Sequence, residues 1–261
     1  TGRHSQAQAA YDELIRTTED PAALLQAHIG RAEALYNLGD YKAALETYRS
    51  AASGSMDGVP SDIVDKLHYG MAWAYLKEGE FKDAISEFKK IVRSTEDKIF
   101  KVSALCQIGD AYQDSGEFDK AVETYDTILR DHPDSFYTDY VQYQLGLVQI
   151  KMQNYDGAIA SFSSVRSNFP NSKMLDEARY ALGLAYFQKQ DYGAARATLE
   201  QFLQEYKESS LRPQAMYLLG TSLYNLGKYD EAIDVFKSVA RLYGQDAQLA
   251  QKAEFEIADC Y

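Results

Sequence analysis

Nearly the same phrase of twelve residues occurs six times along the chain at an almost constant spacing. It reads NLGDYKAALETY at 37–48 and NLGKYDEAIDVF at 225–236. The aromatic residue after its turn falls at six positions: Tyr41, Phe81, Phe118, Tyr155, Tyr192 and Tyr229. The steps between them are 40, 37, 37, 37 and 37 residues. A fixed period of this size indicates an array of stacked structural units, each too small to bury its own core.

Each period predicts two helices joined by a short turn. The second helix carries an aromatic residue, an alanine three residues later and another aromatic four residues after that, as in Tyr229, Ala232 and Phe236. These offsets place all three side chains on one helix face. The alanine recurs in every period, where two helices must approach closely: Ala44, Ala84, Ala121, Ala158, Ala195 and Ala232.

The turn between the two helices has its own residue preference. Four periods place a glycine there: Gly39, Gly79, Gly116 and Gly227. Glycine ends a helix favourably because it adopts positive φ without strain. The fourth and fifth periods have Gln153 and Gln190 instead, so we expect less favourable turns there. Pro133 and Pro170 are expected to end second helices, and residues 53–62 to form a loop or local hinge.

Composition limits what such an array can do. The chain is 46% apolar, which is enough for a large core, and it carries a net charge of −12. Phosphate binding needs a concentrated positive face, so a nucleic-acid partner is disfavoured. The acidity favours solubility, or a preference for basic partners. No stretch approaches the length of a membrane-spanning helix, and two cysteines, Cys106 and Cys260, provide neither a disulfide framework nor a zinc spacing.

No known catalytic motif occurs in the sequence, so we predict no enzymatic activity and no cofactor. His28 and His68 hold equivalent places in successive periods. Two readings are open: a metal pair, which would need the two imidazoles to meet, or two histidines that pack between helices. Acidic pairs at 19–20 and 96–97 are expected to be solvated or to cap helix starts.

The pattern resembles the tetratricopeptide repeat, and the resemblance covers essentially the whole chain. The small residue that this family has in its first helix matches six positions: Ala32, Ala72, Gly109, Gly146, Gly183 and Gly220. The usual tryptophan of the first helix is missing, and the period is 37 residues rather than the family's shorter one. Both departures are loosely similar to a bacterial envelope branch, which includes the lipoprotein of the outer-membrane assembly machinery and the Tol–Pal coordinator.

The resemblance implies an all-α fold, a right-handed superhelical solenoid of antiparallel helix pairs. One array is expected over 1–261, of about seven repeat-lengths. Its predicted parts are the second helix of a truncated repeat (1–24), six repeats (25–64, 65–101, 102–138, 139–175, 176–212 and 213–249) and the first helix of another truncated repeat (250–261). Cut ends of this kind would expose apolar surface, so self-association through them is a further expectation.

In this family the first helices line the concave face, which implies a groove for a partner. The side chains at the inward offsets are Tyr69, Trp73, Leu76, Asp110, Gln113, Tyr143, Leu147, Ile150, Tyr180, Leu184, Phe187, Tyr217 and Tyr224. Tyrosine and tryptophan dominate binding surfaces because they offer large contact area at low entropic cost. The alternative is that these aromatics pack between neighbouring helices. The family's clamp for a partner's C-terminal carboxylate does not match the residues at its positions, among them Lys66 and Gly70.

The sequence therefore predicts a non-catalytic scaffold that binds a protein or peptide segment in its concave groove. A bacterial envelope assembly is the expected setting, and a periplasmic or outer-membrane-associated location is favoured over a cytoplasmic one. The alternative is a structural spacer or a regulatory module of a larger multidomain protein.

Overall fold

Residues 2–261 are described by a computed structural model, with side chains from Gln6 onward, and within this range all regular structure is helical. The predicted all-α fold is therefore confirmed. The helices fall into two compact units, and the boundary along the chain lies between Thr138 and Asp139.

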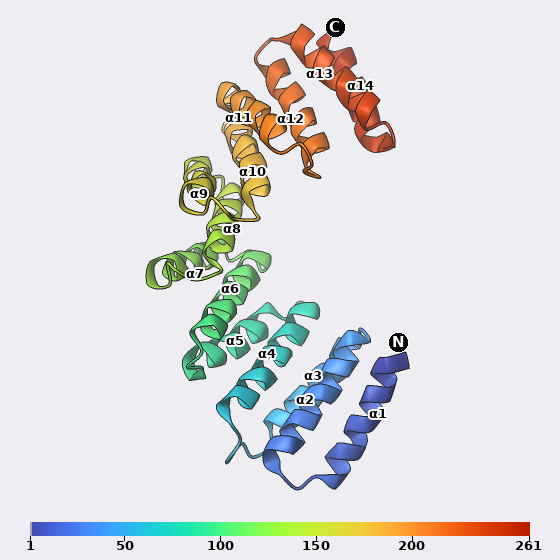
Figure 1. The fold of residues 1–261 in the computed structure, drawn as a ribbon, viewed down its shortest axis with the longest axis vertical. Helices are drawn as coiled ribbons and strands as arrows, with labels where there is room; N and C mark the ends of the chain where they lie inside the picture. Colours follow the sequence, from blue (N-terminus) through green and yellow to red (C-terminus); the bar gives the residue numbers. More distant parts are fainter. Residues whose placement is uncertain (1) are drawn as a thin grey trace. The chain divides into compact units, whose positions relative to one another are not determined.

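Unit 1 is an array of helices in which chain neighbours pack antiparallel (Figure 1). Its helices are α1 (Gly2–Thr17), α2 (Pro21–Asn37), α3 (Tyr41–Ala52), α4 (Ser61–Lys77), α5 (Phe81–Ser94), α6 (Lys98–Asp114) and α7 (Phe118–Asp131). Besides these neighbours, α2 contacts α4, so first helices of successive repeats lie side by side.

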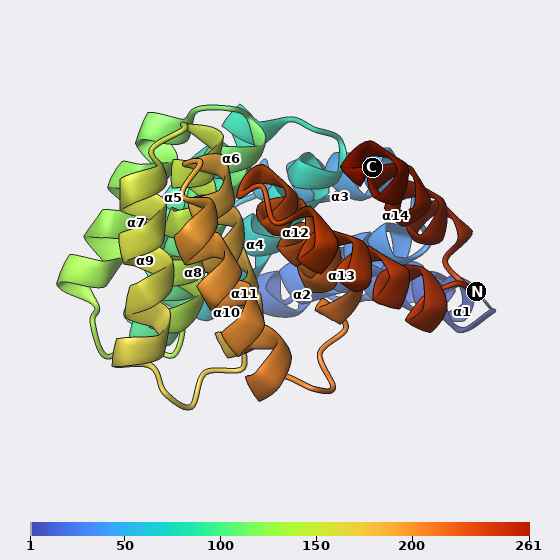
Figure 2. The same cartoon turned by 90° about the horizontal axis from the view of Figure 1, so that it is seen from above.

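Unit 2 repeats the same arrangement. Its helices are α8 (Thr138–Lys151), which begins at the last residue of unit 1, α9 (Tyr155–Asn168), α10 (Leu175–Gln188), α11 (Tyr192–Glu205), α12 (Arg212–Asn225), α13 (Tyr229–Leu242) and α14 (Ala247–Cys260). The first helix α12 contacts both α10 and α14, and Figure 2 shows α12, α13 and α14 alongside one another.

The recurring alanines of the second helices lie in the core, because each is in close contact with a neighbouring helix. All six have no exposed surface. The small residues of the first helices also allow close approach of a neighbouring helix. A Cβ on Gly146, for example, would stand 2.5 Å from Cε1 of Phe162, closer than carbon atoms approach without displacement. The repeat pattern thus predicts the contact points of the helices as well as their number.

The turns follow the prediction made from their residues. Gly39, Gly79, Gly116 and Gly227 all have positive φ. Gln153 and Gln190 also have positive φ, at 60° and 66°, a region that costs energy for residues with a Cβ. The second helices α7 and α9 end two residues before a proline, as predicted, and residues 53–60 form the loop between α3 and α4.

Helix starts are fixed by acidic caps at two predicted places. The Asp20 carboxylate accepts a hydrogen bond from the Ala23 amide at 2.8 Å, and Pro21 occupies the first helical position. The Asp97 carboxylate accepts from the amides of Ile99 and Phe100. These caps set the beginning of α2 and α6, which both contribute residues to one pocket of unit 1.

Candidate functional site

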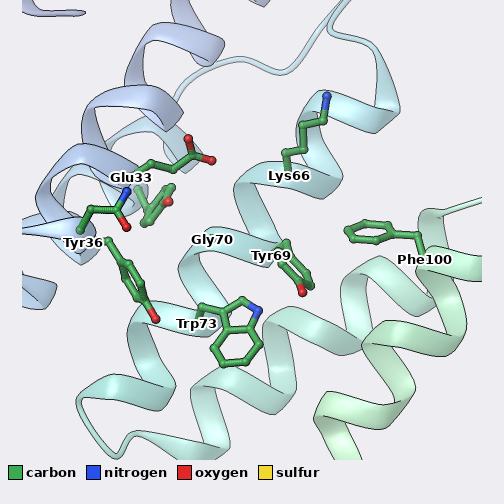
Figure 3. A pocket seen from close by; sticks show the side chains of 9 residues that line it. Glu33, Tyr36, Lys66, Tyr69, Gly70, Trp73 and Phe100 are labelled. Carbon is green, nitrogen blue, oxygen red and sulfur yellow. The ribbon is translucent and has the colours of Figure 1, made fainter. Parts of the chain in front are cut away.

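Three first helices and one second helix of unit 1 enclose a pocket of about 510 Å³. It lies between α2 and α4, with the start of α6 at one side (Figure 3). The lining residues are Glu33, Tyr36, Asn37, Tyr48, Lys66, Tyr69, Gly70, Trp73 and Phe100. It is larger than three other hollows among the described residues, of about 200, 340 and 340 Å³, and more aromatic side chains line it.

Helical spacing brings the lining residues of each helix together. Lys66, Tyr69 and Trp73 lie three and four residues apart on α4 and so share one face. On α2, Glu33 lies three and four residues before Tyr36 and Asn37. Because α2 and α4 are in contact, their two stripes face the same space.

The aromatic walls are braced by the core. The Tyr69 ring lies 6.2 Å from Trp73 and 5.2 Å from Phe100, centroid to centroid. Both Tyr69 and Trp73 also contact Phe88, which has no exposed surface, at 5.9 and 6.5 Å. Edge-to-face pairs of this kind hold rings in fixed orientations, so the walls are set before any partner arrives.

Gly70 allows the Tyr48 side chain to reach the pocket from α3. An added Cβ on Gly70 would lie 2.3 Å from the Tyr48 hydroxyl oxygen. The Tyr48 side chain is almost wholly buried, yet it is among the residues that line the cavity. Burial, followed by the nearby Glu33 carboxylate, raises the pKa of Tyr48, which keeps the hydroxyl neutral and able to donate.

Two charged side chains face the pocket from opposite helices. Burial raises the pKa of Glu33, and the positive charge of Lys66 offsets this in part. Glu33 and Lys66 do not form an ion pair with each other. The Lys66 amine lies 3.5 Å from the Asp62 carboxylate. Figure 3 shows that amine directed away from the aromatic rings.

The predicted groove residues of unit 1 divide into two groups. Tyr69 and Trp73 line the pocket. Leu76 packs against the core of unit 1, Asp110 accepts a hydrogen bond from the Tyr125 hydroxyl at 2.6 Å, and Gln113 is half-buried. The last three do not line the pocket.

The predicted groove residues of unit 2 are half-buried and pack against its own second helices. Tyr143, Leu147 and Ile150 lie on the cluster around Phe162. The remaining five pack on the cluster around Phe202 and Phe236: Tyr180, Leu184, Phe187, Tyr217 and Tyr224. The Tyr217 hydroxyl donates to Glu256 at 2.7 Å. Their roles in binding stay a prediction, and in the structure they build helix contacts.

Sequence reasoning missed several pocket residues. Glu33 and Tyr36 occupy the same offsets in the first repeat as Trp73 and Leu76 in the second, so the repeat register could have found them. Phe100 lies in the first turn of α6, outside the inward stripe. Tyr48 belongs to a second helix, and only the missing side chain of Gly70 brings it in.

Comparison with known families agrees with the repeat pattern. One family model of the tetratricopeptide repeat matches residues 1–61, 143–210 and 180–247. Two further models of the same repeat match residues 103–135 and 65–98. The chain belongs to the tetratricopeptide repeat family. Such repeats generally mediate interactions between proteins and are typically non-catalytic. A search of the curated proteins finds no significant match.

Solved tetratricopeptide repeat proteins share the fold. A repeat protein from Parabacteroides merdae is 17% identical, with a TM-score of 0.60 over 98% of this chain and 93% of its own. MamA from Desulfovibrio magneticus is 22% identical, with a TM-score of 0.58 over 70% of this chain and 96% of its own. YrrB, described as having an unusual peptide-binding site, is 19% identical, with a TM-score of 0.54 over 80% and 98%.

No group of three or more metal-binding side chains comes together among the described residues. His68 contacts a carboxylate, with its Nδ1 2.7 Å from Glu87, as expected of a histidine that packs between helices. No helix in the described range is long and apolar enough to cross a membrane.

Proposed function

We propose that this tetratricopeptide repeat protein is a non-catalytic scaffold that binds a peptide segment of a partner protein at the pocket between α2 and α4. The carrying observation is the set of aromatic rings that line this hollow, two of which, Tyr69 and Trp73, pack against the buried Phe88. Concave, mostly apolar pockets with a few convergent polar groups are the usual form of binding sites. Fixed rings reduce the entropy lost on binding, which favours affinity.

The proposed partner is a protein rather than a nucleic acid. Support comes from the net charge of −12 and from the mixed, aromatic lining of the pocket. Nucleic-acid binding draws on many cationic contacts to phosphate, whereas this pocket has one lysine, turned toward Asp62.

The proposed setting is a bacterial envelope assembly, with a periplasmic or outer-membrane-associated location. The support is the 37-residue period, which is similar to that of the envelope branch of the family. Localisation of a tagged full-length protein in the source organism, by fractionation, would test this part separately.

A structural spacer or regulatory module is the second candidate. The observation that favours it lies in unit 2, where the predicted groove residues pack against the helices of the array itself. The Tyr217 hydroxyl donates its hydrogen bond to Glu256 of the same chain. Under this alternative the inner surface would be inert, and no peptide would bind selectively at the pocket.

Selection of displayed random peptides on the whole chain separates the two candidates. Trp73 is the only tryptophan, so its fluorescence reports binding at the pocket itself. We expect selected synthetic peptides to change this fluorescence and to bind the Tyr36→Ala variant about tenfold more weakly. A tenfold change corresponds to about 1.4 kcal/mol of binding free energy. Phe136→Ala is the matched control, because this ring is 88% exposed and lies outside the pocket.

Two results would contradict the scaffold proposal. One is an absence of selective peptides from repeated selections with a folded chain. The other is a set of peptides that bind the wild type, Tyr36→Ala and Phe136→Ala equally well and leave the Trp73 signal unchanged.

A further inference from the structure

The pocket of unit 1 combines aromatic rings with a single carboxylate. Four rings come from three helices: Tyr36 on α2, Tyr69 and Trp73 on α4, and Phe100 on α6. Glu33 on α2 provides the only acidic side chain of the lining. Rings that surround a carboxylate form a site with a negative potential, because the face of each ring carries partial negative charge.

The Glu33 carboxylate makes no ion pair among the described residues, and Lys66 acts on it only at longer range. The ion pairs of unit 1 involve other acids, and Lys66, the one cation of the lining, lies next to Asp62. Glu33 is exposed while the pocket is empty, and a partner that fills the pocket would take its carboxylate out of water. That step is costly unless the partner brings a positive charge. The site is therefore matched to a positive group.

We propose that the pocket binds the guanidinium group of an arginine side chain in the partner peptide. This inference rests on the proposed function and specifies the chemistry of its ligand. A guanidinium is planar, so it stacks on rings such as Trp73 and Tyr69. Its N–H donors can reach the Glu33 carboxylate in a bidentate pair, and the remaining donors can meet the Tyr48 hydroxyl.

Other ligand chemistries fit the lining less well. A leucine or phenylalanine side chain would fill the aromatic space but would bury Glu33 without a partner. A quaternary ammonium ion would satisfy the rings but would donate no hydrogen bond to Glu33 or Tyr48. Lysine is a compact, strongly hydrated charge and stacks less well than a guanidinium. Lys66 opposes any cation, but its side chain is 62% exposed and its charge is screened by water and salt.

The charge of the whole chain supports the same partner. At a net charge of −12, the protein attracts cationic segments over long range and raises their encounter rate. The selection of arginine itself must come from the pocket, since long-range attraction does not distinguish arginine from lysine.

The test titrates the whole chain with peptides that differ at one position and follows Trp73 fluorescence. The probe is acetyl-Gly-Ser-Arg-Ser-Gly amide, compared with the same peptide carrying lysine, leucine or citrulline, the neutral relative of arginine. We expect the arginine peptide to bind about tenfold more tightly than the citrulline and leucine peptides, and more tightly than the lysine peptide.

Variants assign the effect to Glu33. Glu33→Gln is expected to weaken the arginine peptide about tenfold and to leave the citrulline peptide nearly unchanged. Glu46→Gln removes the same charge from an exposed position on α3 outside the pocket and is expected to change neither. Circular dichroism of both variants checks that the fold is kept.

The outcomes separate this inference from the proposed function. If the leucine peptide binds as tightly as the arginine peptide, or if Glu33→Gln changes nothing, the arginine assignment fails while a peptide site remains. If tetramethylammonium competes as strongly as the arginine peptide, the pocket is a general organic-cation site and the assignment also fails. If neither these probes nor display-selected peptides alter Trp73 fluorescence, the proposed peptide site fails with it.

Discussion

The Tyr48 hydroxyl lies where a side chain on Gly70 would begin. A Cβ added to Gly70 would stand 2.3 Å from the Tyr48 oxygen, 2.5 Å from Cζ and 2.9 Å from Cε1. Carbon and oxygen atoms do not approach so closely without displacement. The glycine is thus a packing requirement within α4, and it also decides that a tyrosine of α3 borders the pocket.

Gly70→Ala is expected to destabilise the protein. The Tyr48 ring has almost no exposed surface and no room to retreat, so the added methyl group overpacks the contact between α3 and α4. Overpacking costs about 1–3 kcal/mol, and the better helix propensity of alanine returns up to about 1 kcal/mol. The net loss, about 1–2 kcal/mol, is measured from the urea midpoint.

Gly193→Ala is the matched control. This glycine is also helical, in α11, but the nearest atom to its added Cβ is an oxygen of Asp191 at 3.8 Å, an ordinary contact. We expect this change to be neutral or stabilising by up to about 1 kcal/mol. A Gly70→Ala protein as stable as the wild type would show that Tyr48 can move at little cost.

The sequence predicted most of the fold because the repeat shows each requirement six times. The alanines of the second helices are a clear case: one buried alanine proves little, but six at one register fix the face of every second helix. The turns are equally predictable, since a glycine in a fixed place indicates positive φ.

The candidate site was predictable only in part. Tyr69 and Trp73 follow from the inward stripe, whereas Phe100 enters from the first turn of α6 and Tyr48 through the gap at Gly70. These two depend on local packing that differs between repeats. A periodic rule describes what repeats share, so it cannot place features that occur in one repeat alone.

Gln153→Gly and Gln190→Gly are expected to stabilise the protein. Both glutamines have positive φ, at 60° and 66°, where the Cβ crowds the following carbonyl. That conformation costs about 1–2 kcal/mol for residues other than glycine, while a glycine loses more chain entropy on folding, by about 0.5–1 kcal/mol. We expect a net gain of about 0.5–1 kcal/mol for each change, measured by thermal and urea unfolding.

The reverse change at an equivalent turn is the control. Gly79 has φ of 75° and nothing within 4 Å of its added Cβ, so Gly79→Gln meets no steric clash with other residues. Any loss of stability in Gly79→Gln then measures the backbone strain less the extra chain entropy that glycine loses on folding. If all three changes left the midpoints unmoved, positive φ would cost no more than that entropy in these turns.

The contact between His68 and Glu87, 2.7 Å from Nδ1 to the carboxylate, predicts an acid-sensitive junction between α4 and α5. Burial acts to raise the pKa of Glu87, but hydrogen bonds from His68 and Lys90 outweigh it and hold the pKa below its usual range. The ionised form is thus favoured in the folded state. Its contribution to stability is complete above the unfolded pKa of about 4.3 and is lost as pH falls through the lower folded value.

Glu87→Gln tests this contact. We expect the variant to be less stable than the wild type at neutral pH by about 1.5–3 kcal/mol, the range for hydrogen bonds to charged groups. The difference should shrink as pH falls below about 4.3. Glu46→Gln, at an exposed position of α3, should show no such convergence. Parallel curves for Glu87→Gln and the wild type down to acid pH would contradict the assignment.

Tyr217 is expected to tie α14 to α12. Its hydroxyl donates to Glu256 at 2.7 Å, and burial together with that carboxylate raises the pKa of Tyr217 to about 12. Removing the hydroxyl in Tyr217→Phe should cost about 1 kcal/mol, the net value of a hydrogen bond. The loss should concentrate in α14, where amide hydrogen exchange at neutral pH should accelerate about fivefold, the factor for about 1 kcal/mol.

The dependence of stability on alkaline pH gives a second test of the hydrogen bond between Tyr217 and Glu256. Because the folded pKa of Tyr217 lies above the unfolded value of about 10, the stability from its neutral hydroxyl is present below pH 10. It is lost as pH rises from there through about 12, and Tyr217→Phe should lack this part of the loss. Tyr224→Phe is the control, since Tyr224 also lies on α12 but its ring packs against Tyr229 at the start of α13. Equal exchange of α14 in both variants would mean that apolar contacts alone hold this helix.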